Sequence, residues 1–318
     1  MRHIVPHTRS HKGRSVQAPS AAVMIRPRYF RSNPQTLADN AFQRNGASAN
    51  RDAVAKAAHD EVTRAVEALR GQGVRIDLFE DEGFETPDSV FLNNWFSMHS
   101  GGHIAIYPMF TPNRRLERRA DIIEFLKRDF RVQDVIDYSG LEPDGLFLEG
   151  TGAMVFDHVE RVAYAVRSNR ADAVLLERFC THFNYEPMVF DTADARGVPV
   201  YHTNVLMCVA TEFAILGKDM IADSKRAEEI KARLEGAGRT IIEITREQVD
   251  NFVGNAFELQ GGNGRILALS TTAHDAMTAE QRSIISESAA LTPLDVPTIE
   301  TGGGSVRCML AGNHLVPR

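Results

Sequence analysis

The chain has 318 residues, of which 43% are hydrophobic and 25% are charged, so it can bury a large core. It carries 36 Lys and Arg against 42 Asp and Glu, a net charge of −6, which disfavours a nucleic-acid-binding protein because phosphate recognition depends on a basic surface. No run of about 18 apolar residues predicts a membrane span. The composition therefore favours a protein that acts on a small molecule or binds another protein.

Cysteine usage indicates the redox compartment. The three cysteines, Cys180, Cys208 and Cys308, are an odd number in a long chain. A disulfide framework is therefore not expected, and a reducing compartment such as the cytoplasm is favoured.

The N-terminal segment differs in composition from the rest of the chain. Residues 1–18 carry Arg2, Arg9, Lys12, Arg14 and three histidines without a single acid. The segment has no apolar stretch typical of a secretory signal. We expect residues 1–20 to be a disordered or tag-like extension and residues 21–318 to form a single catalytic domain.

From residue 21 onward, apolar strands alternate with capped helices, which predicts an α/β fold. Asn50 and the Thr-Ala-Glu-Gln pattern at 278–281 are typical helix starts, and Gly71 and Gly236 are typical helix ends. In chain order, we expect strands at 22–26, 74–79, 89–96, 104–107, 132–138, 146–148, 154–157, 162–166, 188–191, within 205–215, and at 240–244, 265–269, 296–299 and 306–310. Helices are expected at 51–70, 116–126, 171–179, 224–234 and from 278 onward.

A regular spacing organises these elements. Asp88, Gly145 and His202 follow one another at intervals of 57 residues, each at the start of one unit. Five repeats of strand, strand, helix and strand fit the length, and such units would pack around a common centre with their leading loops converging there. Ordinary two-layer α/β packing is the alternative.

Several residues could carry chemistry. Cys308 follows the glycines 302–304, which let the backbone approach a ligand, and Arg307 or a histidine could favour its thiolate. A small buried hydrophobe is the alternative for any cysteine, and we assign that role to Cys180 and Cys208.

Polar side chains also stand at the ends of apolar strands. Glu149 comes directly after the apolar run 146–148 and before two glycines, and His202 lies between two apolar runs. The segment 87–95 likewise ends an apolar run with Asn94 beside the only tryptophan. A solvated turn is the alternative for Glu149.

Metal and phosphate sites are poorly supported. The chain has no His-Glu-x-x-His and no paired Cys-x-x-Cys motif. Glycines 302–304 lack the Lys-Ser/Thr ending of a phosphate loop, and the glycine-rich segment 261–264 precedes a strand rather than a helix.

At these residues the sequence resembles the guanidine-modifying enzymes of the pentein superfamily: arginine deiminases, dimethylarginine hydrolases, amidinotransferases and succinylarginine dihydrolase. It looks closest to the branch called citrulline utilization hydrolase. The similarity covers roughly residues 21–316, with several motifs in the same order and spacing. It implies a five-bladed α/β propeller of pseudo-symmetric ββαβ units around an axial active site.

The resemblance also implies residue roles. The nucleophile falls on Cys308, the general acid/base on His202 and its carboxylate partner on Glu149. Asp88, in the Pro-Asp-Ser-x-Phe loop 87–91, is expected to contact the amino-acid end of the substrate. Arg170, in Ser-Asn-Arg, corresponds to an arginine that holds the substrate carboxylate. Arg115, in the Arg-Arg-x-Glu pattern 114–117, is a second such candidate, with a solvated surface residue as the alternative.

Departures from the deiminase pattern bear on the substrate. Asn94 and Asn204 stand where deiminases place aspartates, and Glu-Gly-Gly-Asp is replaced by Glu-Gly-Thr-Gly at 149–152. A buried guanidinium needs anionic acceptors, whereas a neutral ureido group suits amides that donate and accept. The departures therefore predict citrulline or a close derivative as the small-molecule substrate, and Asn94 and Asn204 as its contacts.

The predicted reaction is hydrolysis to ornithine, ammonia and carbon dioxide through an S-carbamoyl intermediate on Cys308, without a metal or organic cofactor. An arginine deiminase or arginine dihydrolase is the first alternative. A non-catalytic pentein binding protein is the second. The number of subunits stays open, a homo-oligomer included.

Overall fold

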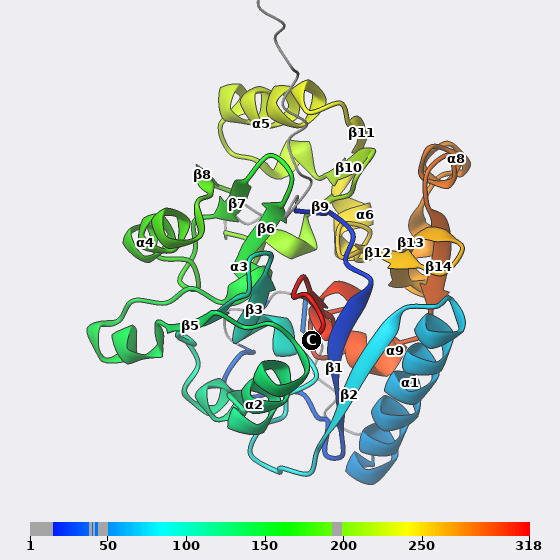
Figure 1. Ribbon diagram of the computed structural model, residues 1–318. Helices are drawn as coiled ribbons and strands as arrows, with labels where there is room; N and C mark the ends of the chain where they lie inside the picture. The colour runs from blue at the N-terminus through cyan, green and yellow to red at the C-terminus, as the bar shows by residue number, and fades with distance from the viewer. Residues whose placement is uncertain (1–14, 38–39, 41, 44–49, 193–198) are drawn as a thin grey trace, which may run out of the picture.

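Five small sheets surround a common centre in the computed structural model, which describes residues 15–37, 40, 42–43, 50–192 and 199–318 (Figure 1). In each sheet of this described part, the middle strand runs antiparallel to one neighbour and parallel to the other. The strands are, sheet by sheet, β3 (Phe96–His99), β4 (His103–Ile106) and β5 (Asp134–Asp137); β6 (Met154–Asp157), β7 (Val162–Val166) and β8 (Glu186–Phe190); β9 (Met207–Val209), β10 (Phe213–Leu216) and β11 (Thr240–Glu243); β12 (Phe257–Gly261), β13 (Gly264–Ser270) and β14 (Ala290–Leu294); and β15 (Ala311–Asn313), β1 (Ala21–Pro27) and β2 (Arg75–Asp81).

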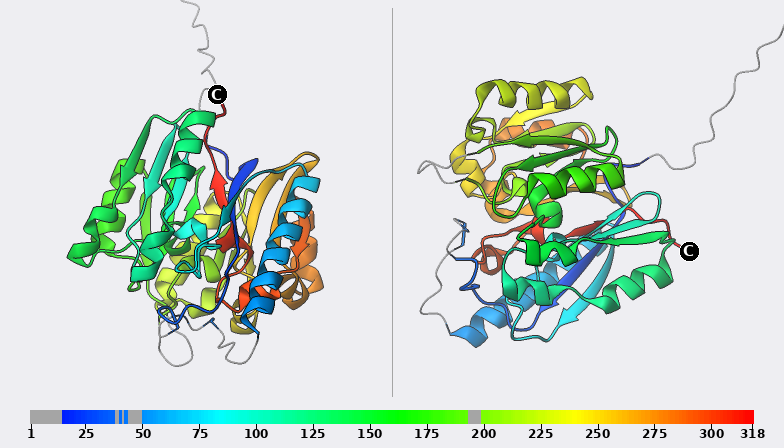
Figure 2. Two further views of the ribbon diagram at one scale, coloured as in Figure 1. Left: turned by 90° about the horizontal axis from the view of Figure 1, so that it is seen from below. Right: turned by 90° about the vertical axis from the view of Figure 1, so that its left-hand side faces the viewer.

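Each parallel pair of strands is connected through a helix, because parallel neighbours cannot be joined by a tight turn. These helices are α1 (Arg51–Gly71), α2 (Ala120–Asp129), α4 (Ala173–Phe183), α5 (Ser224–Gly236) and, after the short α7 (Thr271–Ala276), α8 (Ala279–Ser286). They lie on the outside of the sheets, as Figures 1 and 2 show from three directions. The remaining short helices are α3 (Gly150–Ala153), α6 (Arg246–Asp250) and α9 (Pro297–Glu300). The predicted α/β class and the five repeated units are confirmed.

The two ends of the described chain meet in one sheet. Ala21 of β1 pairs with Asn313 of β15, and β1 also runs parallel to β2 along its whole length. Because β15 directly follows the turn that carries Cys308, this pairing anchors that turn to the first strand of the fold.

The capping residues predicted from the sequence mark the starts of α1 and α8 correctly. The Asn50 side chain accepts a hydrogen bond from the backbone N–H of Asp52 at the start of α1. Thr278 and Gln281 form the reciprocal bonds of a capping box at the start of α8. The predicted helix at 116–126 begins later, because 112–117 forms a 3-10 helix and α2 follows at Ala120.

Three predicted strands are wrong. Residues 146–148 form no strand, and Leu148 makes an isolated bridge with Ala171. Residues 297–300 form α9, because Pro297 suits the first helical turn and the buried Glu61 carboxylate accepts the N–H groups of Thr298 and Ile299. Residues 306–309 form a 3-10 turn instead of a strand. The predicted strand 89–96 likewise contains a 3-10 turn, Leu92–Asn94, before β3 begins.

The predicted N-terminal boundary also differs from the structure. Gln17, Ala18 and Pro19 are buried, so the fold begins before residue 21. The Gln17 amide donates to the carbonyls of Phe156 and Val209, at 2.9 and 2.8 Å, and so bridges β6 and β9. Residues 1–14 of the predicted extension lie outside the described residues. Within the described ranges, no helix has the length and hydropathy needed to cross a membrane.

A buried ion pair connects the second and third sheets. Asp157, at the end of β6, binds the Arg239 guanidinium through two contacts of 2.5 and 3.0 Å, and the same guanidinium donates to the Ala210 carbonyl. Both side chains are at most 3% exposed. Removing one partner would leave the other charge buried without compensation.

We therefore expect Asp157→Ala to lower the free energy of unfolding by about 3–5 kcal/mol, as is typical when one partner of a buried pair is lost. Asp191→Ala is the control, because its pair with Arg167 is more than half exposed and should contribute less than about 1 kcal/mol. Urea unfolding of the parent and both variants gives the two values. Equal effects of the two substitutions would contradict the prediction.

Candidate active site

Short turns that precede the inner strand of each sheet converge at the centre, and we call them the axial turns. They are residues 92–95, 149–153, 202–206, 252–256 and 305–310. The turn at 149–153 packs against those at 92–95 and 202–206, and the turn at 92–95 packs against that at 305–310. They bring together Asn94, Glu149, His202, Asn204, Asn255 and Cys308, which are distant in sequence.

Gly152 allows the closest of these approaches. A Cβ atom at this position would lie 2.2 Å from Asn94 Nδ2 and 2.7 Å from His202 Nδ1. Only a residue without a side chain fits between the two groups. The glycine at 152 is therefore a steric requirement of the site.

The Glu149 carboxylate lies at the centre of the hydrogen bonds. It is fully buried, and its Oε2 atom lies 2.8 Å from His202 Nε2 and 3.2 Å from Arg170 Nη1. Its Oε1 atom accepts the backbone N–H of Phe110 at 3.0 Å. The structure thus brings the Glu149 carboxylate and the His202 imidazole into hydrogen-bonding contact.

Charges and burial set the protonation states of this pair. Burial alone would raise the pKa of Glu149, but the Arg170 charge and the His202 hydrogen bond hold it well below its usual range. Burial lowers the pKa of His202 to about 4, against the opposing effect of Glu149. At neutral pH the imidazole is therefore neutral, donates its Nε2–H to Glu149 and leaves the Nδ1 lone pair available.

Two amides surround the sulfur of the predicted nucleophile. Asn204 Nδ2 and Asn255 Nδ2 each donate to Cys308 Sγ at 3.3 Å. Asn255 is fully buried and is held by a second bond to the Asn204 carbonyl. Its Oδ1 atom accepts the backbone N–H of Arg307. Both amides of this pair therefore direct N–H donors at the sulfur.

Asn255 was missed from the sequence, although a signal exists. Asn94, Asn204 and Asn255 are each followed by one or two apolar residues and then an inner strand, at β3, β9 and β12. The third copy of this pattern marks the axial turn at 252–256. The 57-residue spacing, which was based on Asp88, Gly145 and His202, did not point to this turn.

A small pocket of about 20 Å³ lies over the thiol. Its lining includes Asp88, Asn94, Arg170, His202 and Cys308, together with Thr36, Asn40, Phe91, Arg114, Tyr201 and the glycines 302–304. This volume holds about one water molecule, so lining side chains would have to move to admit a larger ligand. Four of the five predicted substrate contacts face the pocket or the sulfur.

The free polar atoms of the lining indicate what it can bind. Asp88 Oδ2 accepts from Asn33 Nδ2 at 2.8 Å, whereas Asp88 Oδ1 has no partner among the described residues. Asn94 Oδ1 accepts from Arg114 Nη1 at 2.8 Å, and Asn94 Nδ2 has no partner in the part of the chain that the structure describes. Asn204 Oδ1 is also without a partner in the described ranges.

Arg115 is the predicted contact that faces neither the pocket nor the sulfur. Its guanidinium donates to the carbonyls of Met109 and Phe110, at 3.0 and 3.3 Å, and lies 3.4 Å from Glu142. The neighbouring Arg114 lines the pocket instead. The role of Arg115 therefore stays a prediction without support from this geometry.

Five ββαβ units around axial turns that carry cysteine, histidine and glutamate define a protein of the pentein superfamily. The chain belongs to the family described as N,N dimethylarginine dimethylhydrolase, eukaryotic, whose match spans residues 26–315. No curated protein sequence matches the chain.

Solved structures share the fold. Apo ArgZ, an arginine dihydrolase from cyanobacteria, aligns with 16% identity and a TM-score of 0.69 over 91% of this chain, which spans only 40% of that protein. The N-terminal domain of ArgZ bound to substrate gives the same identity and TM-score with 96% of that domain covered. A dimethylarginine dimethylaminohydrolase adduct aligns with 14% identity and a TM-score of 0.61, over 94% of this chain and 100% of that one.

We expect Gly152→Ala to abolish most catalytic activity, because the added methyl group must displace the Asn94 amide or the His202 ring. Gly140→Ala is the matched control, since a Cβ atom there meets nothing within 4 Å. Turnover and circular dichroism of both variants test this. Full activity of a folded Gly152→Ala variant would show that the close approach is unimportant.

We also expect Asn255→Ala to slow alkylation of Cys308 by iodoacetamide at neutral pH by about tenfold, because a hydrogen bond to the thiolate is lost. Cys180 and Cys208 provide an internal reference, since burial raises the pKa of each to about 12. Asn251→Ala is the control variant, because that amide bonds to the Glu247 carbonyl. Equal labelling rates in the two variants would argue against the role of Asn255.

Proposed function

We propose that the protein is a cysteine hydrolase that cleaves the ureido group of citrulline or a close derivative to ornithine, ammonia and carbon dioxide. The observation that carries this proposal is that two side-chain amides of the site, Asn94 in the pocket lining and Asn204 beside the sulfur, leave Nδ2 and Oδ1 respectively unpartnered among the described residues. This agrees with the resemblance to the citrulline utilization hydrolase branch.

The orientation of each amide follows from its other contact. Asn94 Oδ1 accepts from the Arg114 guanidinium, so its free atom is the donor Nδ2. Asn204 Nδ2 donates to the sulfur, so its free atom is the acceptor Oδ1. A ureido group offers one carbonyl oxygen and several N–H groups, and this combination matches it. A guanidinium offers no acceptor for Asn94 Nδ2.

The remaining pocket groups suit the amino-acid end of the substrate. Asp88 Oδ1 can accept hydrogen bonds from the substrate ammonium group. Arg170 is the proposed contact for the substrate carboxylate, since it lines the same pocket. In the proposed mode of binding, the charged end of the substrate lies against charged residues and its neutral end against amides.

The proposed chemistry begins with the neutral His202. Its Nδ1 atom takes the Cys308 proton, the sulfur attacks the ureido carbon, and the amides of Asn204 and Asn255 hold the sulfur. His202 returns the proton to the ornithine nitrogen as the carbon–nitrogen bond breaks, which leaves an S-carbamoyl cysteine. Water, deprotonated by His202, then releases carbamate, which decomposes to ammonia and carbon dioxide.

A cationic substrate is the second candidate, because one oxygen atom of the Asp88 carboxylate has no partner among the described residues. The family is described by dimethylarginine hydrolysis, and ArgZ by arginine dihydrolysis. The products separate these activities. Citrulline hydrolysis gives one ammonia per ornithine, arginine dihydrolysis gives two, arginine deimination accumulates citrulline, and dimethylarginine hydrolysis gives citrulline and dimethylamine.

We expect the purified protein to form ornithine and ammonia in equal amounts from citrulline and to act poorly on arginine and dimethylarginine.

Asn94→Asp should lower citrulline turnover at least about tenfold, because a carboxylate oxygen replaces the donor that faces the ureido carbonyl. Cys308→Ser should abolish turnover, and Asn251→Asp should retain it. Amino-acid analysis and an ammonia assay measure these outcomes, and citrulline accumulating from arginine would contradict the assignment.

A further inference from the structure

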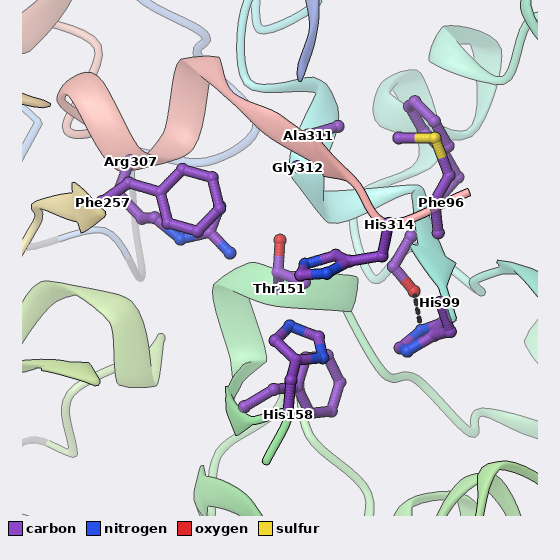
Figure 3. A pocket seen from close by; sticks show the side chains of 12 residues that line it. Phe96, His99, Thr151, His158, Phe257, Arg307, Ala311, Gly312 and His314 are labelled. Carbon is purple, nitrogen blue, oxygen red and sulfur yellow. Dashed lines mark hydrogen bonds between the residues drawn. The ribbon is translucent and has the colours of Figure 1, made fainter. Parts of the chain in front are cut away.

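A second cavity lies next to the axial turns, separate from the pocket over the thiol. It measures about 10 Å³ and is lined by His99, His158, Phe257, Arg307 and His314, with further residues from β3, β15 and the turn at 149–153. Figure 3 shows the Arg307 guanidinium and the rings of His158 and His314 directed toward the same space. Arg307 thus faces this cavity, whereas its neighbour Cys308 faces the other.

The cavity lining carries a positive charge that has no ion-pair partner among the residues that the structure describes. Arg307 Nη1 donates to the Leu310 carbonyl at 2.8 Å, and the guanidinium carbon lies 4.1 Å from the centre of the Phe257 ring. No carboxylate of the described residues lies within ion-pair distance of Arg307; the two acids next to lining residues, Asp157 and Glu258, pair with Arg239 and Arg265. Burial lowers the pKa of Arg307 to about 10, so it remains charged at neutral pH.

The three histidines add donors without adding charge. Burial lowers the pKa of His99 and His158 well below the usual range and that of His314 to about 3, so all three are neutral at neutral pH. His99 and His158 already bond to Ser97 and Tyr185, at 2.7 and 2.8 Å. His314 Nδ1 has no partner in the described part of the chain, and its ring lies 4.0 Å from that of His158.

We propose that this cavity is a binding site for a single monatomic anion of the size of chloride. The fixed charge of the lining is that of Arg307, which one negative charge would neutralise, and a volume near that of one water molecule excludes sulfate and phosphate. A metal cation would meet the guanidinium at close range without a carboxylate ligand. The guanidinium and the His314 ring supply N–H donors to the anion.

Crystals of the full chain grown in sodium bromide test the site directly. We expect an anomalous peak within hydrogen-bonding distance of Arg307 and His314 Nδ1. The proposal would be overturned if the cavity held no peak. Bromide bound only at the surface would be an adventitious ion only and would overturn it in the same way. This result does not depend on whether citrulline is the substrate.

Thermal unfolding provides a second test in solution. A bound anion stabilises the folded chain, so the melting temperature should rise with chloride and saturate, relative to sodium gluconate at equal ionic strength. Arg307→Met should remove this dependence, and Arg307→Lys should keep part of it. Arg246→Met is the matched control, because it removes the same charge from an ion pair at the surface. A chloride effect that persists in Arg307→Met would overturn the proposal.

Discussion

The ionised carboxylate of Glu149 is the constraint on which the active site depends. A buried charge is costly unless hydrogen bonds and opposite charges compensate it, and this one is bound by His202, Arg170 and the Phe110 N–H. The carboxylate therefore connects the axial turns at 149–153 and 202–206 with the loops that carry Phe110 and Arg170. The same bond fixes which ring nitrogen of His202 carries the proton.

Repetition of the ββαβ unit explains why so many polar groups meet at one place. Each sheet contributes one axial turn, and the inner strand that follows holds the turn at the centre. The turn that carries Cys308 is secured by the pairing of β15 with β1, which closes the chain. A repeated backbone therefore supplies five equivalent positions, on which different side chains provide a thiol, an imidazole, a carboxylate and amides.

The sequence predicted the site residues better than it predicted their local structure. Glu149, His202 and Cys308 stand out beside glycines or apolar runs, but their expected roles follow only from the resemblance to the guanidine-modifying penteins. Residues 306–309 were misread as a strand because apolar composition does not distinguish a buried strand from a buried turn. The burial of Gln17 depends on carbonyl groups of Phe156 and Val209, more than a hundred residues away, which no local pattern reveals.

The low pKa of His202 has a consequence for how the cysteine is activated. An imidazolium next to the sulfur would stabilise a thiolate by charge, but burial beside Arg170 and Arg114 keeps this ring neutral at physiological pH. The amides of Asn204 and Asn255 provide hydrogen bonds to the sulfur instead. They add no charge next to the reacting carbon. A neutral ureido group would suit neutral groups around the sulfur. A charged side chain at this place would be left buried without a counter-charge when a neutral substrate binds, and this would weaken binding.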